Sequence, residues 1–238
     1  MQYYIGLSIL STIYDTGAAH VTGGSRRVGM GRERFRAEER RILSLLEGRL
    51  LAKDDIAREA QGRPFFPGRE AVDFNISHSG VLTAISHVKG KNLRTGCDVE
   101  RVQPRSGAGK IAEEFFSAGE KNYVFQAGFD EAKFYEIWTL KECFLKLRGL
   151  SVFDMAVCPS FIGEKNEFAF DAAVPIPLSF YLYELSGGMM RYMLAAALEG
   201  KEQQPPEIRW FSHLSLDCKK TAEIKAALNP AETVSPKI

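Results

Sequence analysis

The sequence has few cysteines and almost no net charge. Its four cysteines, at positions 97, 143, 158 and 218, lie too far apart to match the spacing of a zinc site or a redox motif. We therefore expect them to be small hydrophobic residues in a protein of a reducing compartment. Because 31 basic residues are balanced by 30 acidic ones, the chain also lacks the global positive charge of a general nucleic-acid binder.

Long apolar runs and targeting signals are missing as well. No stretch approaches the roughly 18–20 apolar residues that span a bilayer, and Met1–Leu10 lacks the basic region and cleavage site of a signal peptide. We therefore expect a cytoplasmic protein that does not enter a membrane. The Walker loop, the Gly-x-Gly-x-x-Gly loop, the Gly-x-Ser-x-Gly elbow and the His-Glu-x-x-His pair are also absent, which removes support for several large enzyme classes.

The composition that is present is typical of a folded protein, with 45% hydrophobic, 11% aromatic and 26% charged residues. A length of 238 residues allows one large domain or two small ones. Tyr3–Ile9 predicts a buried strand, and the Gly-rich stretch 16–31 predicts a loop. Apolar residues then recur at helical spacing over 34–60, with Gly48 as a weak point between two helical segments.

Two hairpins are predicted further along the chain. Phe74–Ser77 and Val81–Ser86 have the pattern of short strands joined by a loop that ends in glycine, which would place His78 at the hairpin tip. Residues 178–185 and 189–198 flank a Gly-Gly pair and predict a second hairpin with a tight turn. The sheet is therefore expected to continue late in the chain.

Asp130–Arg148 has the clearest helical pattern, with Asp130 as a possible N-cap and Gly149 just beyond the last turn. The composition shifts at a polar, Gly-containing linker over Pro104–Lys110, and a boundary between two halves could lie near Arg94. The final residues, 229–238, have the composition of a frayed tail.

Two carboxylates share one face of a predicted strand. Asp98 and Glu100 are two residues apart, so they project from the same face about 6.5–7 Å apart along the strand, while Cys97 and Val99 point to the other face. A hard cation would suit such a pair. The simpler interpretation is that this is the solvent face of an antiparallel strand.

A third carboxylate lies on the long predicted helix. Glu142 shares an apolar stripe with Tyr135, Trp138 and Leu145, so we expect it to be partly desolvated. Lys146 is one turn further on, and an ordinary helix ion pair worth about 0.3–0.5 kcal/mol is its simplest explanation. With the two strand carboxylates, Glu142 would nevertheless give Mg²⁺ its preferred oxygen ligands and leave room for a phosphate.

Arginines are concentrated near the N-terminus, where residues 25–41 contain seven arginines and three glutamates and the first 50 residues contain no lysine. The seven are Arg26, Arg27, Arg32, Arg34, Arg36, Arg40 and Arg41. Because arginine binds phosphate through two parallel hydrogen bonds, the cluster could hold a polyphosphorylated ligand. A solvated helix face explains it equally well.

Arg63 and His78 are single residues with open interpretations. Arg63 precedes Pro64, which favours an extended backbone and could present the guanidinium outward, although an ordinary turn is simpler. A lone histidine more often caps a turn than binds a ligand, but the expected place of His78 in a hairpin loop keeps a binding role open.

Three segments, in this order and spacing, resemble the 4′-phosphopantetheinyl transferase superfamily, and the Sfp type is the nearest match. They are Phe74–Gly80 (FNISHSG), Gly96–Glu100 (GCDVE) and Trp138–Lys146 (WTLKECFLK). Gly62-Arg63-Pro64 precedes them as a Gly-Lys/Arg-Pro element does in that family. The resemblance covers roughly residues 34–198 and departs from the usual pattern at Val99, where isoleucine is common, and at Cys143, where alanine or serine is common.

The resemblance implies an α+β fold, a pseudo-dimer of two similar subdomains with coenzyme A and Mg²⁺ in the cleft between them. We accordingly expect an N-terminal subdomain of residues 1–94, a C-terminal subdomain of residues 95–215 and a tail of residues 216–238. The resemblance also implies the reaction. The 4′-phosphopantetheine arm of coenzyme A is transferred to a serine of an apo acyl or peptidyl carrier protein, and adenosine 3′,5′-bisphosphate is released. We expect a monomer.

The resemblance also implies roles for residues. Asp98, Glu100 and Glu142 would bind Mg²⁺, and Glu142, or a water that it orients, would take the proton of the carrier serine. Lys146 would lie against the pyrophosphate and stabilise or protonate the leaving group. The coenzyme A phosphates would be held by Arg63, Ser77, His78 and Arg41, with Arg40 as a one-residue alternative to Arg41.

Two other functions stay open at this point. A Mg²⁺-dependent phosphodiesterase could use the same carboxylates to activate water and would cleave coenzyme A without a carrier protein. A catalytically inactive module that binds coenzyme A or the carrier would keep the arginines, but the complete set of Asp98, Glu100, Glu142 and Lys146 argues against it.

Overall fold

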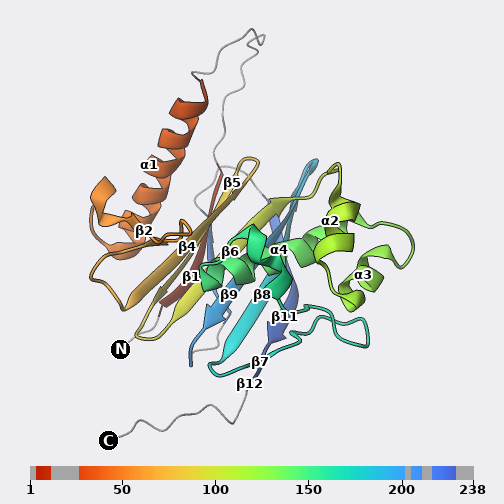
Figure 1. Ribbon diagram of the computed structural model, residues 1–238. Coiled ribbons are helices and arrows are strands. Elements are labelled where there is room, and N and C mark those ends of the chain that lie inside the picture. The colour runs from red at the N-terminus through yellow and green to blue at the C-terminus, as the bar shows by residue number, and fades with distance from the viewer. Residues whose placement is uncertain (1–3, 12–26, 202–204, 211–215, 229–238) are drawn as a thin grey trace, which may run out of the picture.

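The computed structural model describes residues 4–11, 27–201, 205–210 and 216–228. These residues form a mixed α+β fold with two four-stranded sheets (Figure 1). The first sheet has the order β10-β1-β5-β4, with bounds β1 Tyr4–Ser11, β4 Val72–Ser79, β5 Leu82–Lys89 and β10 Glu207–Trp210. The second has the order β11-β8-β9-β6, with bounds β6 Arg94–Arg101, β8 Leu178–Gly187, β9 Met190–Glu199 and β11 Asp217–Lys225.

Pairing in both sheets is antiparallel, except that β1 and β10 are parallel. Two small two-stranded sheets are formed by β2 (Ala57–Arg58) with β3 (Pro64–Phe65) and by β7 (Ala173–Val174) with β12 (Ala227–Leu228). The described helices are α1 (Arg27–Glu47), α2 (Ala108–Phe115), α3 (Ala118–Phe125) and α4 (Glu131–Arg148), with short 3-10 turns η1 (Lys53–Asp55) and η2 (Val152–Val157). None of the helices among these residues is long and apolar enough to cross a membrane.

Each main sheet carries one long helix on a face (Figure 1). On the first sheet, Ile42 and Leu43 of α1 are buried with Phe74 and Ile85 of β4 and β5. On the second sheet, α4 packs through a large aromatic and aliphatic core that includes Phe180 of β8. The opposite face of the second sheet packs on side chains of β5. The two sheets therefore share a core, and α4 lies over strand β6.

Most of the predicted elements are confirmed. The strand near the N-terminus is β1, the two hairpins are β4–β5 and β8–β9, and the long helix is α4. Asp130 caps α4 by accepting hydrogen bonds from the amides of Ala132 and Lys133, and Gly149 ends it with a left-handed φ of 69°. All four cysteines are free. Cys97 and Cys143 are fully buried, as expected of small hydrophobic residues, whereas Cys158 is half-buried and Cys218 is exposed.

Some boundaries differ from the predictions. Helix α1 begins at Arg27, inside the stretch expected to be a loop, and it ends before Gly48, whose φ is +66°. The second helical segment expected beyond this glycine is only the 3-10 turn η1. His78 is not at the hairpin tip, because the strands run on to Ser79 and Leu82 and His78 pairs with Thr83.

The sheets also cross the expected chain divisions. Residues 207–210 return to the first sheet as β10, and residues 217–225 form β11 at the edge of the second sheet, with Ile224 in the core. The tail predicted over 229–238 lies outside the described residues.

A buried ion pair fixes α4 to α3. Lys141 Nζ lies 3.0 Å from Glu120 Oε2, and both side chains are at most 1% exposed. Glu120 also accepts hydrogen bonds from the amides of Ser117 and Phe161, each 2.8 Å long. Glu120 therefore ties the start of α3 to the chain beyond η2 as well as to α4.

We expect Lys141→Met to lower the free energy of unfolding by about 3–5 kcal/mol, because it leaves the buried Glu120 carboxylate without its cation. Urea unfolding at pH 7 would measure the loss. The matched control is Lys110→Met on the exposed surface of α2, which should change stability by roughly 0.5 kcal/mol or less. Equal losses in the two variants would contradict the assigned role of the ion pair.

Candidate active site

Asp98 lies buried between β6 and α4 rather than on a solvent face. Its side chain is 3% exposed, which makes the simpler interpretation of the Asp98 and Glu100 pair wrong for Asp98. Oδ1 accepts a hydrogen bond of 2.7 Å from Ser77 Oγ and lies 2.5 Å from Lys146 Nζ. Oδ2 is buried and has no hydrogen-bond partner among the described residues. A buried oxygen of this kind is an available ligand.

The negative charge of Asp98 acts on both Glu100 and Glu142. Burial and the charge of Asp98 raise the pKa of Glu100. Burial, followed by the charges of Asp98 and Glu100, raises the pKa of Glu142 to about 7. The prediction that Glu142 is partly desolvated is therefore confirmed. Three acidic groups from β6 and α4 repel one another here, so an added cation would relieve the repulsion.

Lys146 forms its ion pair with Asp98 and not with Glu142 as the helical spacing suggested. Its ammonium group also donates a 2.7 Å hydrogen bond to Ser77 Oγ. Burial lowers the pKa of Lys146, but the charge and hydrogen bond of Asp98 more than offset it, and the pKa is raised. Tertiary packing onto β6 overrides the local i,i+4 preference, and the lysine stays charged.

Gly96 allows α4 to approach β6 closely enough to form this site. A Cβ atom at position 96 would lie 2.8 Å from the Cys143 carbonyl oxygen and 2.9 Å from Leu147 Cβ. Both of those atoms belong to α4, one in the residue three positions before Lys146 and the other in the residue that follows it. The glycine of the GCDVE segment therefore sets the distance between the strand carboxylates and the helix.

Arg63 is buried, so its guanidinium does not have the outward direction that the following Pro64 could have favoured. It donates hydrogen bonds to Asp73 Oδ2 (2.6 Å), to the Thr95 carbonyl (2.8 Å) and to the Lys146 carbonyl. These contacts join the residue just before β3 to β4, to β6 and to the end of α4. Arg63 lies beside the carboxylate site, but its described bonds are all made to the protein itself.

Ser77 is also buried and bonded to the protein. Its hydroxyl donates to Asp98 and accepts from Lys146 and from the Val99 amide. One donor and two acceptors are the full capacity of a serine hydroxyl. A phosphate could therefore contact Ser77 only by displacing one of these partners.

His78 points to the opposite face of β4. Its Nε2 atom contacts the Glu39 carboxylate of α1, which is buried, while the ring is 42% exposed. Glu39 was not among the predicted site residues. A carboxylate at helical spacing from apolar residues was the pattern that indicated Glu142. Glu39 has the same pattern, because it shares a stripe of α1 with the buried residues Ile42 and Leu43.

Arg41 lies elsewhere on α1. It is exposed, pairs with Glu38 at 2.7 Å, and lines a groove with Arg40, Leu45 and other residues of the outer helix face. A different pocket of about 380 Å³ is lined by Glu142 and Lys146 together with Arg63 and its neighbours. The structure thus gathers Asp98, Glu100, Glu142, Lys146, Arg63 and Ser77, and it does not bring Arg41 to them.

The carboxylates fit a hard cation in chemical type. They offer oxygen ligands only, and one oxygen of Asp98 is buried without a partner among the described residues. Burial, together with the charge of Asp98, raises the pKa values of Glu100 and Glu142. The described residues do not hold three acidic, histidine or cysteine groups already arranged around one metal position. Binding of a cation would therefore draw these side chains closer together.

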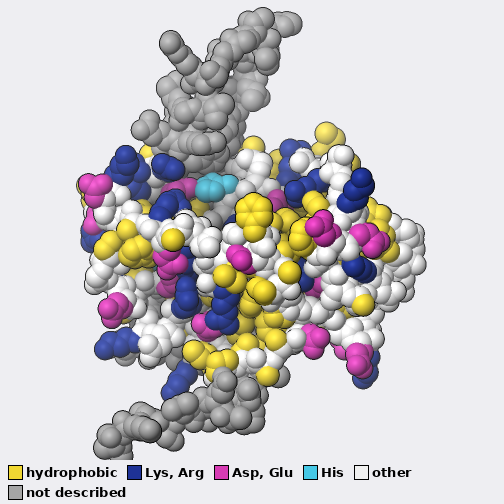
Figure 2. Space-filling model, in the orientation of Figure 1, with side chains coloured by type: hydrophobic (Ala, Val, Ile, Leu, Met, Phe, Trp, Pro, Cys, Tyr) yellow, Lys and Arg dark blue, Asp and Glu magenta, His cyan; other side chains and the backbone are white. Residues whose placement is uncertain are grey.

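Acidic and basic side chains are interspersed on the face shown in Figure 2, with hydrophobic side chains between them. This pattern agrees with the balanced charge of the sequence. Attraction for a polyanion therefore depends on local groups such as Lys146.

Comparisons with known proteins indicate the family of this chain. The sequence profile of the 4′-phosphopantetheinyl transferase superfamily matches residues 94–187, which include β6 and α4. The 4′-phosphopantetheinyl transferase AcpT of Escherichia coli O157:H7 is 32% identical over 159 residues, which are 65% of this chain and 77% of AcpT. Two Bacillus subtilis relatives, the 4′-phosphopantetheinyl transferases ffp and Sfp, are 38% and 36% identical over 105 residues, 42% of this chain and 44% of each relative.

An acidic cluster beside a charged lysine, held between a strand and a helix of an α+β fold, is suited to transfer of a phosphate-containing group. The chain belongs to the 4′-phosphopantetheinyl transferase superfamily and is a 4′-phosphopantetheinyl transferase by this relationship.

Proposed function

We propose that this chain transfers the 4′-phosphopantetheine arm of coenzyme A to a serine of an apo acyl or peptidyl carrier protein and releases adenosine 3′,5′-bisphosphate. The observation that carries the proposal is the convergence of Asp98, Glu100 and Glu142 with Lys146 where α4 crosses β6. Such a site can hold a pyrophosphate through a cation and a lysine while a carboxylate removes a proton.

We propose that Asp98, Glu100 and Glu142 hold Mg²⁺. When bound, the metal supplies positive charge to the pyrophosphate of coenzyme A and so stabilises the charge that develops as the phosphoanhydride breaks. Lys146 remains charged beside Asp98 and would interact with the same pyrophosphate. Asp98 therefore has two tasks, because one oxygen orients Lys146 and the other is available to the metal.

Glu142 is proposed to act as the base, directly or through a water. It would accept the proton of the carrier serine as the serine oxygen attacks the phosphorus that bears pantetheine. The bond from this phosphorus to the bridging oxygen breaks, and the electron pair leaves with adenosine 3′,5′-bisphosphate. Lys146 would stabilise or protonate that leaving group. A pKa near 7 suits a group that must be a base at neutral pH.

Binding of coenzyme A by Arg63, Ser77, His78 and Arg41 stays a prediction. Arg63 and Ser77 lie beside Lys146, so we propose that they act on coenzyme A mainly by fixing the backbone and ammonium group of that lysine. His78 and Arg41 lie on the α1 side, where they would reach only more distant phosphate groups.

The division into two subdomains is likewise proposed. Each four-stranded sheet carries one long helix, α1 or α4, and the sheets meet along β4 and β6, which supports a pseudo-dimer with its site at that junction. The boundary near Arg94 falls at the start of β6. A monomeric state and a cytoplasmic location stay predictions.

Incubation of the purified protein with coenzyme A, Mg²⁺ and an apo carrier protein tests the proposal. We expect the carrier to gain a single phosphopantetheine group, seen by intact mass spectrometry, and we expect EDTA to abolish the gain because the acidic cluster then lacks its cation. Cleavage of coenzyme A with an unmodified carrier would instead indicate the phosphodiesterase. Binding without any reaction, over a panel of acyl and peptidyl carriers, would indicate the inactive module.

A further inference from the structure

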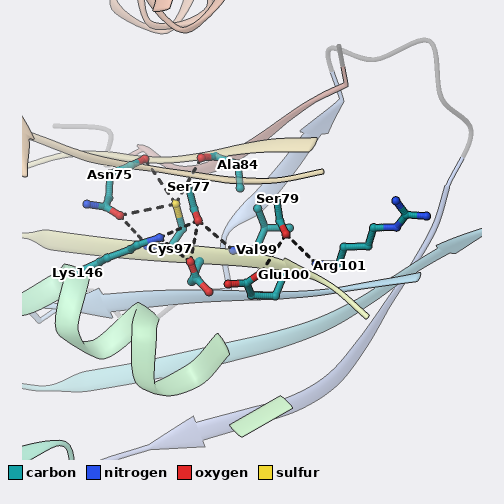
Figure 3. Close-up of polar contacts among 10 residues, drawn as sticks. Asn75, Ser77, Ser79, Ala84, Cys97, Val99, Glu100, Arg101 and Lys146 are labelled. Atoms are coloured by element: carbon teal, nitrogen blue, oxygen red, sulfur yellow. Dashed lines mark hydrogen bonds and ion pairs between the residues drawn. The ribbon is translucent and has the colours of Figure 1, made fainter. Parts of the chain in front are cut away.

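Strand β4 holds β6 through a ladder of side chains. Each strand is at the edge of its own sheet, so within the described ranges neither has a backbone partner on the side that faces the other. Every second residue of β4 instead accepts a hydrogen bond from a backbone amide of β6, always 22 residues further along the chain. Figure 3 shows the contacts of Asn75, Ser77 and Ser79. The pairs are Asp73 with Thr95, Asn75 with Cys97, Ser77 with Val99, and Ser79 with Arg101.

The two serines of this ladder make an additional contact of the same kind. Ser77 Oγ donates to Asp98 Oδ1 at 2.7 Å while it accepts from the Val99 amide. Ser79 Oγ donates to Glu100 Oε2 at 2.9 Å while it accepts from the Arg101 amide at 2.9 Å. Each serine thus binds one strand carboxylate and the amide that follows it. The repeat of two residues in β4 matches the spacing of the two carboxylates in β6.

We infer that the serines of β4 form a template that sets the position of the strand carboxylates, and that Ser79 is the positioning residue for Glu100. Lys146 also holds Asp98, whereas Ser79 makes the one direct hydrogen bond from a side-chain hydroxyl to Glu100 in the described part of the chain. Ser79 reaches one oxygen of the carboxylate, so it can orient the group without enclosing it. Hydrogen bonds of this kind fix metal-binding carboxylates in the direction of the ion.

The inference rests on the proposed function, because Glu100 is taken as a Mg²⁺ ligand. Ser79→Ala removes the hydroxyl, and we expect the Mg²⁺ concentration for half-maximal transfer to rise by roughly 10-fold or more. The KM for coenzyme A at saturating Mg²⁺ should stay within about 2-fold, since the Ser79 hydroxyl is already bonded to Glu100 and to the Arg101 amide. Ser79→Thr keeps a hydroxyl and should restore the Mg²⁺ dependence of the wild type.

Two readouts do not depend on turnover. Calorimetric titration of Mg²⁺ into the protein should show weaker binding for Ser79→Ala than for the wild type. Hydrogen exchange of the Arg101 amide in metal-free protein should be faster in the same variant, because its acceptor is gone. The matched control is Thr221→Ala, which removes a side-chain hydrogen bond to the Leu182 carbonyl at the opposite edge of the second sheet. That control should leave Mg²⁺ binding unchanged.

The outcomes separate the two claims. Unchanged Mg²⁺ affinity in Ser79→Ala, with an active wild type, would overturn the positioning role and leave the transferase intact. Equal weakening in Ser79→Ala and Thr221→Ala would reduce the effect to general loss of stability and also overturn it. A wild type that binds Mg²⁺ but modifies no carrier would refute the proposed function alone, and a wild type that binds no Mg²⁺ would refute both.

Discussion

Glu142→Gln is expected to lower the rate of phosphopantetheine transfer by roughly 10²–10⁴-fold, the range for loss of a general base. The amide cannot accept the proton of the carrier serine, and it contributes less charge to a cation. Coenzyme A binding should be mostly retained, because Lys146 keeps its ion pair with Asp98 in this variant. Single-turnover transfer followed by mass spectrometry, with coenzyme A affinity measured by calorimetry, would test both parts. Transfer at the wild-type rate would refute the assigned role.

The stability of the same variant provides a control for folding. Folded Glu142 keeps its proton until about pH 7, whereas an unfolded glutamate loses it near 4.5, so the folded state binds more protons between these values. The free energy of unfolding contributed by this group therefore falls as pH rises from about 5 to about 8. Glutamine cannot ionise and should remove that part of the pH dependence.

We accordingly expect metal-free Glu142→Gln to melt at the same temperature as the wild type, or higher, at pH 8. Thermal unfolding of both proteins at pH 5 and pH 8, without metal, measures the difference. Added Mg²⁺ should raise the melting temperature of the wild type more than that of the variant. The metal offsets repulsion among three carboxylates in the wild type but between only two in Glu142→Gln. A variant that melts well below the wild type at pH 8 would contradict the raised pKa.

Local signals in the sequence were sufficient for the elements that carry the site. The cap residue Asp130 and the terminal Gly149 define α4 by interactions within a few residues, and the β4–β5 hairpin follows from alternating residues around a glycine turn. The apolar stripe of α4 likewise predicted the desolvation of Glu142, which depends on helix geometry and burial.

The contacts between side chains within the site could not be predicted from local sequence signals. The helical spacing suggested an ion pair between Lys146 and Glu142, but packing of α4 on β6 brings Asp98 closer. Arg63 seemed free to point outward because nothing local shows that Asp73 and Thr95 will surround it. Such pairings join residues far apart in the chain, so they depend on how the two sheets meet.

One long-range feature did leave a pattern in the sequence. The polar residues Asp73, Asn75, Ser77 and Ser79 alternate with residues that face α1, which is unusual for a strand between two layers of protein. Asn75 and Ser77 are buried and Asp73 and Ser79 are partly buried, so their polar groups require partners. The amides of β6 are those partners, and the alternation could have indicated a neighbouring strand edge.

Gly96→Ala is expected to abolish most of the transfer activity although it changes no ionisable group. The added Cβ would lie 2.8 Å from the Cys143 carbonyl oxygen and 3.0 Å from the Leu147 amide nitrogen, which are backbone atoms that cannot rotate away. Helix α4 must then move away from β6, and it carries Glu142 and Lys146 with it. Displacement of reacting groups by about 1 Å can cost roughly 10²-fold in rate. The overlap should also cost about 1–3 kcal/mol of stability.

Gly109→Ala is the matched control, because it makes the same change in α2 where the nearest atom to the new Cβ is 3.8 Å away. It should keep full activity and gain up to about 1 kcal/mol of stability, since alanine favours a helix over glycine. Transfer assays at saturating coenzyme A and Mg²⁺, with urea unfolding of both variants, make the comparison. Full activity in Gly96→Ala would show that the distance between α4 and β6 does not govern the reaction. Loss of activity in a Gly96→Ala chain that still folds would show that catalysis depends on how closely the helix approaches the strand.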